Sequence, residues 1–141
     1  MFATYRDLLD HDAAGFRAVF EALDTPGCVL FHCRVGKDRT GVIAMLLLDL
    51  VGVPEEHIVA DYAVTAQYMG GFLRTQRVLV SLALRRSVPR CLFESNPCEM
   101  ERTIAYLREH YGTARRYLTE AAGCPPELLN RVAAKLRGPV C

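Results

Sequence analysis

The chain has 141 residues, of which 51% are hydrophobic, and a formal net charge of +1 at pH 7. This length fits one domain, residues 1–141, and the near-neutral charge gives no global reason to expect binding to nucleic acid or to a membrane. Acidic residues in the first twelve positions exclude a signal peptide there, and the most apolar stretch, Val42–Leu48, is too short to span a bilayer. We therefore expect a soluble, cytoplasmic domain.

The N-terminal half combines helical and extended patterns. Its first ten residues could supply a short strand, and Asp12 can cap a helix that runs to about Leu23. Cys28–His32 is a continuous apolar run of strand length, which is typical of a strand buried on both faces. A short loop follows, and Thr40–Val51 then has the pattern of a buried helix.

The C-terminal half is predicted to be helical throughout, because its apolar residues recur at helical spacing. The expected helices are Pro54–Met69 and Phe72–Arg86, separated at Gly70 and Gly71, then a helix from the capping residues Asn96 and Glu99 to Gly112, and two shorter helices over Thr113–Ala122 and Pro125–Leu136.

Six or seven helices and one strand predict an α/β fold that is predominantly helical, with few strands. An average domain places about 20–25% of its residues in strands, far more than this chain offers. A strand buried on both faces also needs a neighbour at each edge. We therefore expect a truncated domain, whose N-terminal sheet strands are short or missing, or a homodimer completed by strand exchange.

The six cysteines lack the C-x-x-C spacing of zinc or redox sites. Cys28 and Cys33 are about 16 Å apart along an extended chain, beyond the ~7 Å that a disulfide allows. We expect most of the six to be buried thiols, with Cys33 as the exception. The sequence assigns no role to the other five, which are Cys28, Cys91, Cys98, Cys124 and Cys141.

The loop before the predicted helix at Thr40 has the composition of an anion-binding site. Backbone N–H groups of a short glycine-containing loop point into one concavity, and the helix dipole adds positive charge. Arg39 can add a planar, two-pronged donor for phosphate oxygens. A Walker nucleotide loop is excluded because Lys37 is followed by Asp38 rather than by Ser or Thr. Cys33 in such a loop is expected to ionise readily, and its thiolate could attack a bound phosphoryl group.

The ten residues His32–Gly41, HCRVGKDRTG, resemble the signature H-C-x-x-G-K-D-R-T-G of the protein tyrosine phosphatase superfamily, in its bacterial and fungal tyrosine/serine phosphatase branch. Residues 46–65 and 111–123 are similar to the helical C-terminal half of that branch, so the likeness covers most of the chain from about Phe20. The resemblance implies a metal-independent cysteine phosphatase, without a cofactor, that acts through a phosphocysteine intermediate. Its implied substrates are phosphotyrosine or phosphoserine/threonine proteins, or phosphoinositides.

The resemblance also assigns roles within the loop. Cys33 would be the nucleophile and Arg39 would bind the transition state. Thr40 would assist the second step, and His32 would order the loop and help to form the thiolate. The residues implied to bind the phosphate are Arg34, Val35, Gly36, Lys37 and Gly41, with Lys37 adding positive potential.

The proton donor is not identified by the resemblance. The family usually uses an aspartate well upstream of the cysteine, but only 32 residues precede Cys33. Asp7, Asp10 and Asp12 are candidates by position, although each also fits a solvated residue or a helix cap. Asp38 is the alternative, although its place between two cations also fits a structural role. A chain without the acid would be a catalytically weak phosphate-binding module, which is the alternative function.

Structural interpretations are preferred for residues outside the loop. Tyr62 and Tyr68 fit the core side of an amphipathic helix better than the mouth of a pocket. Two arginine clusters could meet anionic lipid or a phosphorylated partner, but a solvated helix face is the preferred interpretation. They comprise Arg85, Arg86 and Arg90, and separately Arg115 and Arg116.

Overall fold

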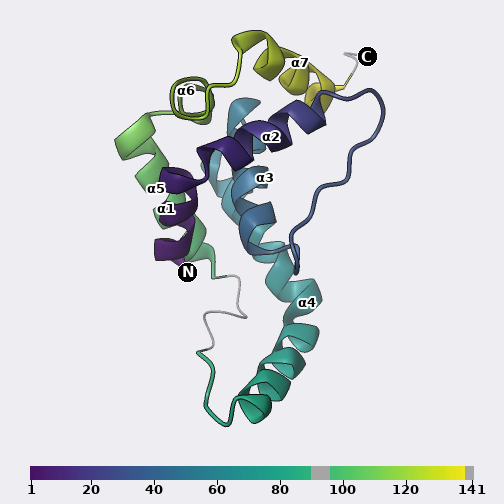
Figure 1. Cartoon of the computed structure of the whole chain (residues 1–141), viewed down its shortest axis with the longest axis vertical. Helices are drawn as coiled ribbons and strands as arrows, with labels where there is room; N and C mark the ends of the chain where they lie inside the picture. Colours follow the sequence, from purple (N-terminus) through teal and green to yellow (C-terminus); the bar gives the residue numbers. More distant parts are fainter. Residues whose placement is uncertain (90–95, 139–141) are drawn as a thin grey trace.

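The computed structural model describes residues 1–89 and 96–138, apart from the side chains of residues 65, 66, 67 and 69, and these residues include no strand. The predicted fold, predominantly helical and poor in strands, is confirmed (Figure 1). The predictions for Arg90, Cys91 and Cys141 lie outside the described residues. The elements are α1 (Phe2–His11), α2 (Ala13–Leu23), α3 (Asp38–Leu50), α4 (Glu55–Ala83), α5 (Pro97–Tyr111), α6 (Ala114–Arg116), the π-helical turn η2 (Tyr117–Ala121) and α7 (Pro126–Arg137).

The hydrophobic core is centred on α3. This helix contacts α1, α4, α6 and α7, while α1 packs on α5 and α2 packs on α7. Val42, Met45 and Leu46 of α3 are buried, together with aromatic side chains from α1 and α2. A helix that is apolar around most of its circumference is stable only when other elements cover it. The N-terminus of α3 is therefore held firmly where it meets the loop of interest.

Two buried or half-buried carboxylates join helices that are distant in the sequence. Asp49 of α3 pairs with Arg108 of α5 and accepts a hydrogen bond of 2.8 Å from the backbone N–H of Ala114. Asp10 of α1 accepts hydrogen bonds of 2.9 Å from the hydroxyls of Tyr106 and Tyr111. These contacts fix α1, α3 and α5 relative to one another.

The segment predicted as a strand, Cys28–His32, is not paired in a sheet within the described residues. It forms part of the extended connection from α2 to α3 that runs outside the helices (Figure 1), and the side chain of Leu30 is 88% exposed. The first ten residues, which could have supplied a neighbouring strand, form α1 and bury Tyr5 and Leu9 one turn apart. Without a neighbour, an apolar run of strand composition has no sheet to join.

α4 is one continuous helix, and the break predicted at Gly70 and Gly71 is wrong. A helical glycine costs about 1 kcal/mol relative to alanine but keeps its backbone hydrogen bonds, so two glycines weaken a helix without ending it. Side chains of the next turn also bond the glycine carbonyls, with Arg74 donating to Gly70 at 3.0 Å and Thr75 to Gly71 at 3.1 Å. Although α4 has 29 residues, no helix among the described residues is long and apolar enough to cross a membrane.

The predicted caps are present in part. α2 begins directly after Asp12, but the Asp12 side chain makes no capping hydrogen bond. The Asn96 side chain caps α5 by accepting a hydrogen bond of 3.1 Å from the N–H of Cys98. Glu99 accepts a hydrogen bond from the N–H of Phe2 and lies 3.4 Å from the amino group of Met1, so it joins α1 to α5. The helix predicted over Thr113–Ala122 is divided into α6 and η2.

Candidate active site

The loop after Cys33 wraps around the sulfur of that residue. Gly36 adopts a φ of +75°, in the left-handed region that glycine occupies without strain, and α3 begins two residues later at Asp38. The resulting turn directs the backbone N–H groups of Val35, Gly36 and Thr40 to the Cys33 sulfur. The loop therefore has the form of an anion-binding site with the thiol at its centre.

The Thr40 hydroxyl joins the two ends of this loop. It accepts a hydrogen bond of 2.9 Å from the N–H of Cys33 and donates one to the sulfur. Partial burial of the thiol opposes its ionisation, but the hydrogen bonds from Thr40, Val35 and Gly36 outweigh burial and lower the pKa of Cys33 to about 6. At neutral pH the group is therefore mainly a thiolate, the form that acts as a nucleophile.

A cavity of about 260 Å³ opens beside the thiol. Its polar lining consists of Asp12, His32, Cys33, Arg39 and Thr40, and its other walls are mainly apolar: Leu8, Phe16, Val19, Phe31 and Ile43, with Gly15. The cavity thus brings together a thiol, a guanidinium and a carboxylate, and among the described residues Asp12 is the one carboxylate in its lining.

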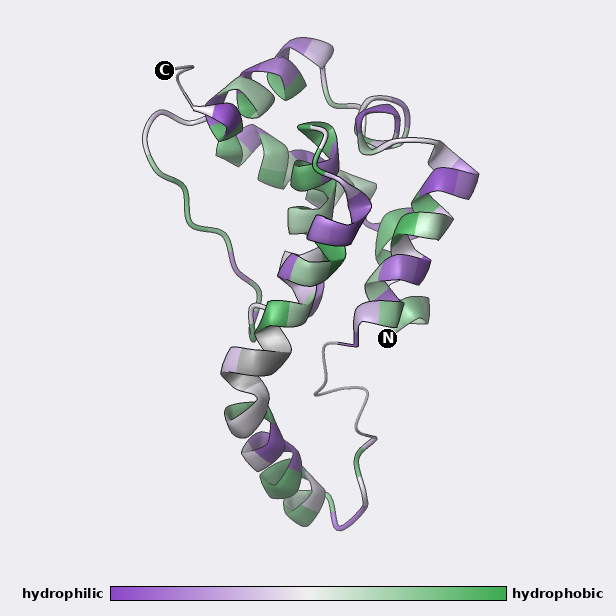
Figure 2. Cartoon of the chain, turned by 180° about the vertical axis from the view of Figure 1, so that it is seen from behind, coloured by the Kyte–Doolittle hydropathy of each residue, from purple (hydrophilic) through white to green (hydrophobic). Residues whose placement is uncertain are grey.

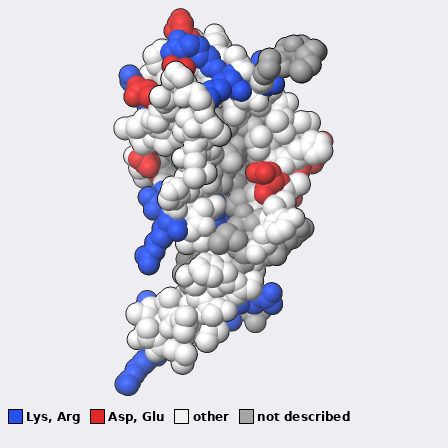
Figure 3. All heavy atoms as spheres, turned by 90° about the vertical axis from the view of Figure 1, so that its right-hand side faces the viewer, with Lys and Arg blue, Asp and Glu red and all other residues white. Residues whose placement is uncertain are grey.

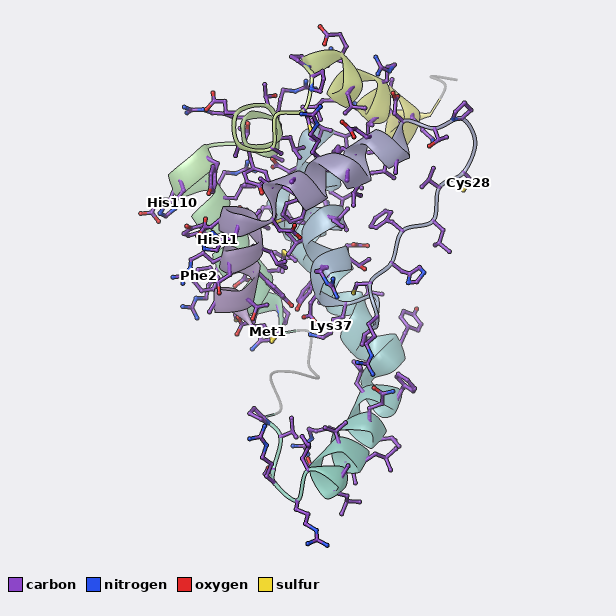
Figure 4. The ribbon with its side chains drawn as sticks, in the orientation of Figure 1. Met1, Phe2, His11, Cys28, Lys37 and His110 are labelled. Atoms are coloured by element: carbon purple, nitrogen blue, oxygen red, sulfur yellow. The ribbon has the colours of Figure 1, made fainter. Side chains whose placement is uncertain are left out.

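Lys37 and Asp38 belong to a different, interior network. Lys37 is 2% exposed, and its Nζ donates to Asp38 Oδ1 at 2.6 Å. The Tyr5 hydroxyl donates to the same oxygen at 2.6 Å and lies 2.6 Å from the Tyr62 hydroxyl. Burial and these hydrogen bonds raise the pKa of Tyr5, so its hydroxyl stays protonated. Figure 4 labels Lys37 at the lower end of α3, and neither Lys37 nor Asp38 lines the cavity of Cys33.

His32, Arg34 and Gly41 complete the motif. His32 is exposed, and its Nδ1 lies 3.0 Å from the carbonyl oxygen of Cys33. Arg34 is also exposed. Gly41 packs closely on α4, where a Cβ would lie 2.9 Å from a ring carbon of Tyr62. That contact gives a physical reason for glycine at the end of the motif.

Only one of the three N-terminal aspartates lines the cavity. Asp10 is bonded to the tyrosines of α5, and exposed Asp7 lies 3.4 Å from Arg6. Asp12 lines the cavity because it lies at the junction of α1 and α2, and Phe16, one turn further along α2, lines the cavity with it. Its position in sequence made Asp12 a candidate, but the fold of this junction could not be read from the spacing.

The other described cysteines lie outside the site, and the expectation of burial is only partly met. Cys124 is buried, whereas Cys28 and Cys98 are exposed. Figure 4 places Cys28 on the outer edge of the connection between α2 and α3. Across residues 1–89 and 96–138, no group of three or more His, Cys, Asp or Glu side chains is arranged to hold a metal ion.

Comparison with known proteins matches residues 1–138 to a family described as the tyrosine phosphatase family. A tyrosine-protein phosphatase of Nostoc commune is 52% identical over 69 residues, which are 48% of this chain and 24% of that protein. A putative tyrosine-protein phosphatase of Cupriavidus necator is 32% identical over 94 residues, 66% of this chain and 34% of that protein. The triple specificity protein phosphatase PtpB of Mycobacterium tuberculosis is 56% identical over 34 residues, 24% of this chain and 12% of that protein. The chain thus spans about a third or less of each relative.

Proposed function

Because the chain belongs to the tyrosine phosphatase family, we propose that it hydrolyses phosphate monoesters through a phosphocysteine formed on Cys33. The observation that carries the proposal is the convergence of the Thr40 hydroxyl and the loop N–H groups on the Cys33 sulfur, which lowers its pKa to about 6. N–H groups arranged around an anion at a helix start also suit phosphate oxygens. Arg39, in the lining of the same cavity, supplies a forked donor for them.

The reaction would proceed in two displacements at phosphorus. In the first, the Cys33 thiolate attacks, an S–P bond forms, the ester P–O bond breaks, and the leaving oxygen takes a proton from a carboxylic acid. In the second, water attacks phosphorus, the S–P bond breaks, and the carboxylate accepts a proton from the water. Arg39 would bind the equatorial oxygens in both transition states, and the Thr40 hydroxyl would stabilise the sulfur as it leaves.

We assign the proton transfer to Asp12 rather than to Asp38. A general acid must come within hydrogen-bond reach of the leaving oxygen, and Asp12 lines the cavity beside Cys33. Asp38 is outside that lining, and its Oδ1 accepts hydrogen bonds from Lys37 and Tyr5. Asp38 therefore fits the structural role, in which it holds the start of α3 and the loop in register with α1.

The walls of the cavity favour an aromatic ester among the implied substrates. Phe16, Val19, Phe31 and Ile43 offer apolar contact to a ring attached to the phosphate. Phosphoserine presents less apolar surface, and a phosphoinositide would place hydroxyl groups against these side chains without partners. We therefore propose phosphotyrosine as the preferred protein substrate, with phosphoserine, phosphothreonine and phosphoinositides turned over less efficiently.

The test measures hydrolysis of p-nitrophenyl phosphate in the presence of EDTA. The wild type is expected to turn over, Cys33→Ser to be inactive, and the control Cys28→Ser to retain activity, since that exposed thiol is outside the cavity lining. Rapid acid quenching should trap labelled phosphate on the peptide that contains Cys33. A wild type that binds inorganic phosphate without turnover would instead establish the alternative, a phosphate-binding module. Initial rates with phosphotyrosine, phosphoserine and phosphoinositide substrates would rank the substrates.

A further inference from the structure

The outer part of α4 and the turn after it, residues 68–88, here called the α4 tip, carry exposed apolar side chains. Tyr68, which the sequence favoured as a core residue, is 83% exposed, and Phe72, Leu79 and Leu82 are exposed as well. Their spacing of four, seven and three residues places these four side chains on one face of the helix. Figure 2 shows the outer part of α4, where hydrophobic and hydrophilic segments alternate, extending beyond the other helices. Exposed Thr75 lies between Phe72 and Leu79 on this face. Apolar side chains gathered on one exposed face mark an interaction site more often than apolar residues scattered singly.

A basic hollow adjoins that apolar face. It has a volume of about 680 Å³, shares Leu82 with the apolar face, and is lined by Arg77, Val78, Ser81, Leu82, Arg85, Arg86 and Ser87. The sequence from Tyr62 to Pro89 contains four arginines and neither Asp nor Glu. In the view of Figure 3, basic residues appear around the lower part of the molecule and acidic ones are confined to the part above. Cationic and hydroxyl donors beside apolar contacts match a phosphate group attached to a hydrocarbon.

Arg85 occupies a backbone conformation that does not suit its side chain. Its φ is +49°, and it is the one described non-glycine residue with a positive φ. It follows the last turn of α4 at the position where helices usually place glycine, and the N–H of Arg86 donates to the carbonyl of Ser81 at 3.1 Å. Glycine would adopt this conformation with less strain, so a role of the arginine side chain would explain its presence at this position.

We propose that the α4 tip binds the surface of an anionic lipid bilayer. A basic amphipathic helix places its apolar face between lipid headgroups and its cations near lipid phosphates, and Tyr68 and Phe72 have the aromatic character of interfacial residues. A second copy of the chain is the competing occupant of an apolar helix face. It would bring four more arginines, and no carboxylate from the same segment, to the same interface. Repulsion between these like charges disfavours that pairing, whereas an anionic surface supplies the missing negative charge.

Membrane binding would bring the candidate active site close to the bilayer. The inner end of α4 contributes Tyr62, which contacts Tyr5 beside Asp38 and packs where Gly41 leaves room. The same helix thus connects the α4 tip to the loop of Cys33. This consequence rests on the proposed phosphatase function, whereas lipid binding itself does not.

The test uses Cys33→Ser protein, so that binding is measured without turnover. Sedimentation with phosphatidylcholine vesicles is compared with sedimentation with vesicles that also contain phosphatidylserine, at low and high salt. Binding is expected only to the anionic vesicles, and salt should weaken it. Replacing Arg85 and Arg86 together by Gln should weaken binding by roughly tenfold or more, whereas the matched pair Arg115→Gln, Arg116→Gln on α6 should leave it unchanged. Leu79→Gln with Leu82→Gln should also weaken it by about tenfold or more, in contrast to exposed Leu136→Gln on α7.

The Arg85→Gly variant separates the effect of losing the cation from a loss of binding through unfolding. This variant removes the cation and relieves the strained φ, so its Tm should be equal or higher while vesicle binding falls. The proposal is overturned if wild type and variants bind anionic vesicles alike, or if neutral vesicles bind as well. It is also overturned if light scattering shows a dimer that Leu79→Gln and Leu82→Gln dissociate, because a second copy then covers the face. Turnover of p-nitrophenyl phosphate without vesicle binding would refute this inference and leave the proposed function standing.

Discussion

Replacing Thr40 by alanine should raise the pKa of Cys33 and slow its reaction at neutral pH. The Thr40 hydroxyl donates to the sulfur, and of the hydrogen bonds to the sulfur this one lowers the pKa of Cys33 most. A hydrogen bond to a charged group contributes about 1.5–3 kcal/mol, and about 1.4 kcal/mol shifts a pKa by one. The pKa should therefore move from about 6 to between roughly 7 and 8. At pH 7 the thiolate fraction would fall from about 90% to between about 50% and 10%.

The assay is the pH dependence of alkylation by iodoacetamide, followed at the Cys33 peptide by mass spectrometry, with the exposed Cys98 as an internal reference for the reagent. Thr40→Ser keeps a hydroxyl and should keep the half-maximal rate near pH 6. Because the pKa in the fold is lower than the ordinary value of 9.0, ionisation also favours the folded state: this contribution is complete above pH 9, declines as the pH falls from 9 to about 6, and is absent below 6. An unchanged alkylation profile in Thr40→Ala would show that the hydroxyl is not what holds the thiolate.

Substitutions at Asp12, Gly41 and Asp49 test the site and its support, and Asp38→Asn is the comparison for the first of them. Asp12→Asn should reduce turnover of phenyl phosphate, whose leaving group needs a proton, by about 10²-fold or more and p-nitrophenyl phosphate far less. If Asp38→Asn shows this selective loss instead, the assignment of the acid is wrong. Gly41→Ala should lower the free energy of unfolding in urea by about 1–3 kcal/mol, because the new methyl group would lie 2.9 Å from the Tyr62 ring; no loss would mean that the ring moves freely. Asp49→Asn should cost about 1.5–3 kcal/mol by removing a charged acceptor that bonds α5 and the N–H of Ala114, and an unchanged urea midpoint would contradict that role.

The loop and the helix after it could be predicted because both are defined locally, although α3 begins at Asp38, two residues before the expected start at Thr40. The motif from His32 to Gly41 fixes which N–H groups can reach the sulfur, and Gly36 marks the turn that directs them. Features that depend on contacts between distant parts of the chain could not be predicted from the sequence. The helical start of the chain, the unpaired Cys28–His32 segment and the continuous α4 depend on which partners are available, and spacing alone does not reveal them.

Side-chain positions within the motif were the hardest feature to predict. The spacing showed three cations near the cysteine but not which way each side chain points. Lys37 is directed into the protein, where burial requires a partner for its charge, and Asp38 supplies it. Arg39 lines the cavity. We prefer Asp12 to Asp38 as the acid for a related reason. Asp38 pairs with the buried Lys37, whereas Asp12 lines the cavity beside Cys33.

Because Lys37 is paired with Asp38, hydrogen bonds rather than nearby cations stabilise the Cys33 thiolate. Lys37 and Asp38 form an ion pair of 2.6 Å, so together they add little net charge to the loop. The groups that lower the pKa of Cys33 are short-range donors, the Thr40 hydroxyl and the N–H groups of the loop. Hydrogen bonds act over one contact distance, whereas attraction between separated charges is screened by salt within about 10 Å at 0.1 M. A thiolate held in this way depends on the shape of the loop. Tyr5 of α1 supports that shape by donating to Asp38, and the Tyr62 hydroxyl of α4 lies 2.6 Å from the Tyr5 hydroxyl.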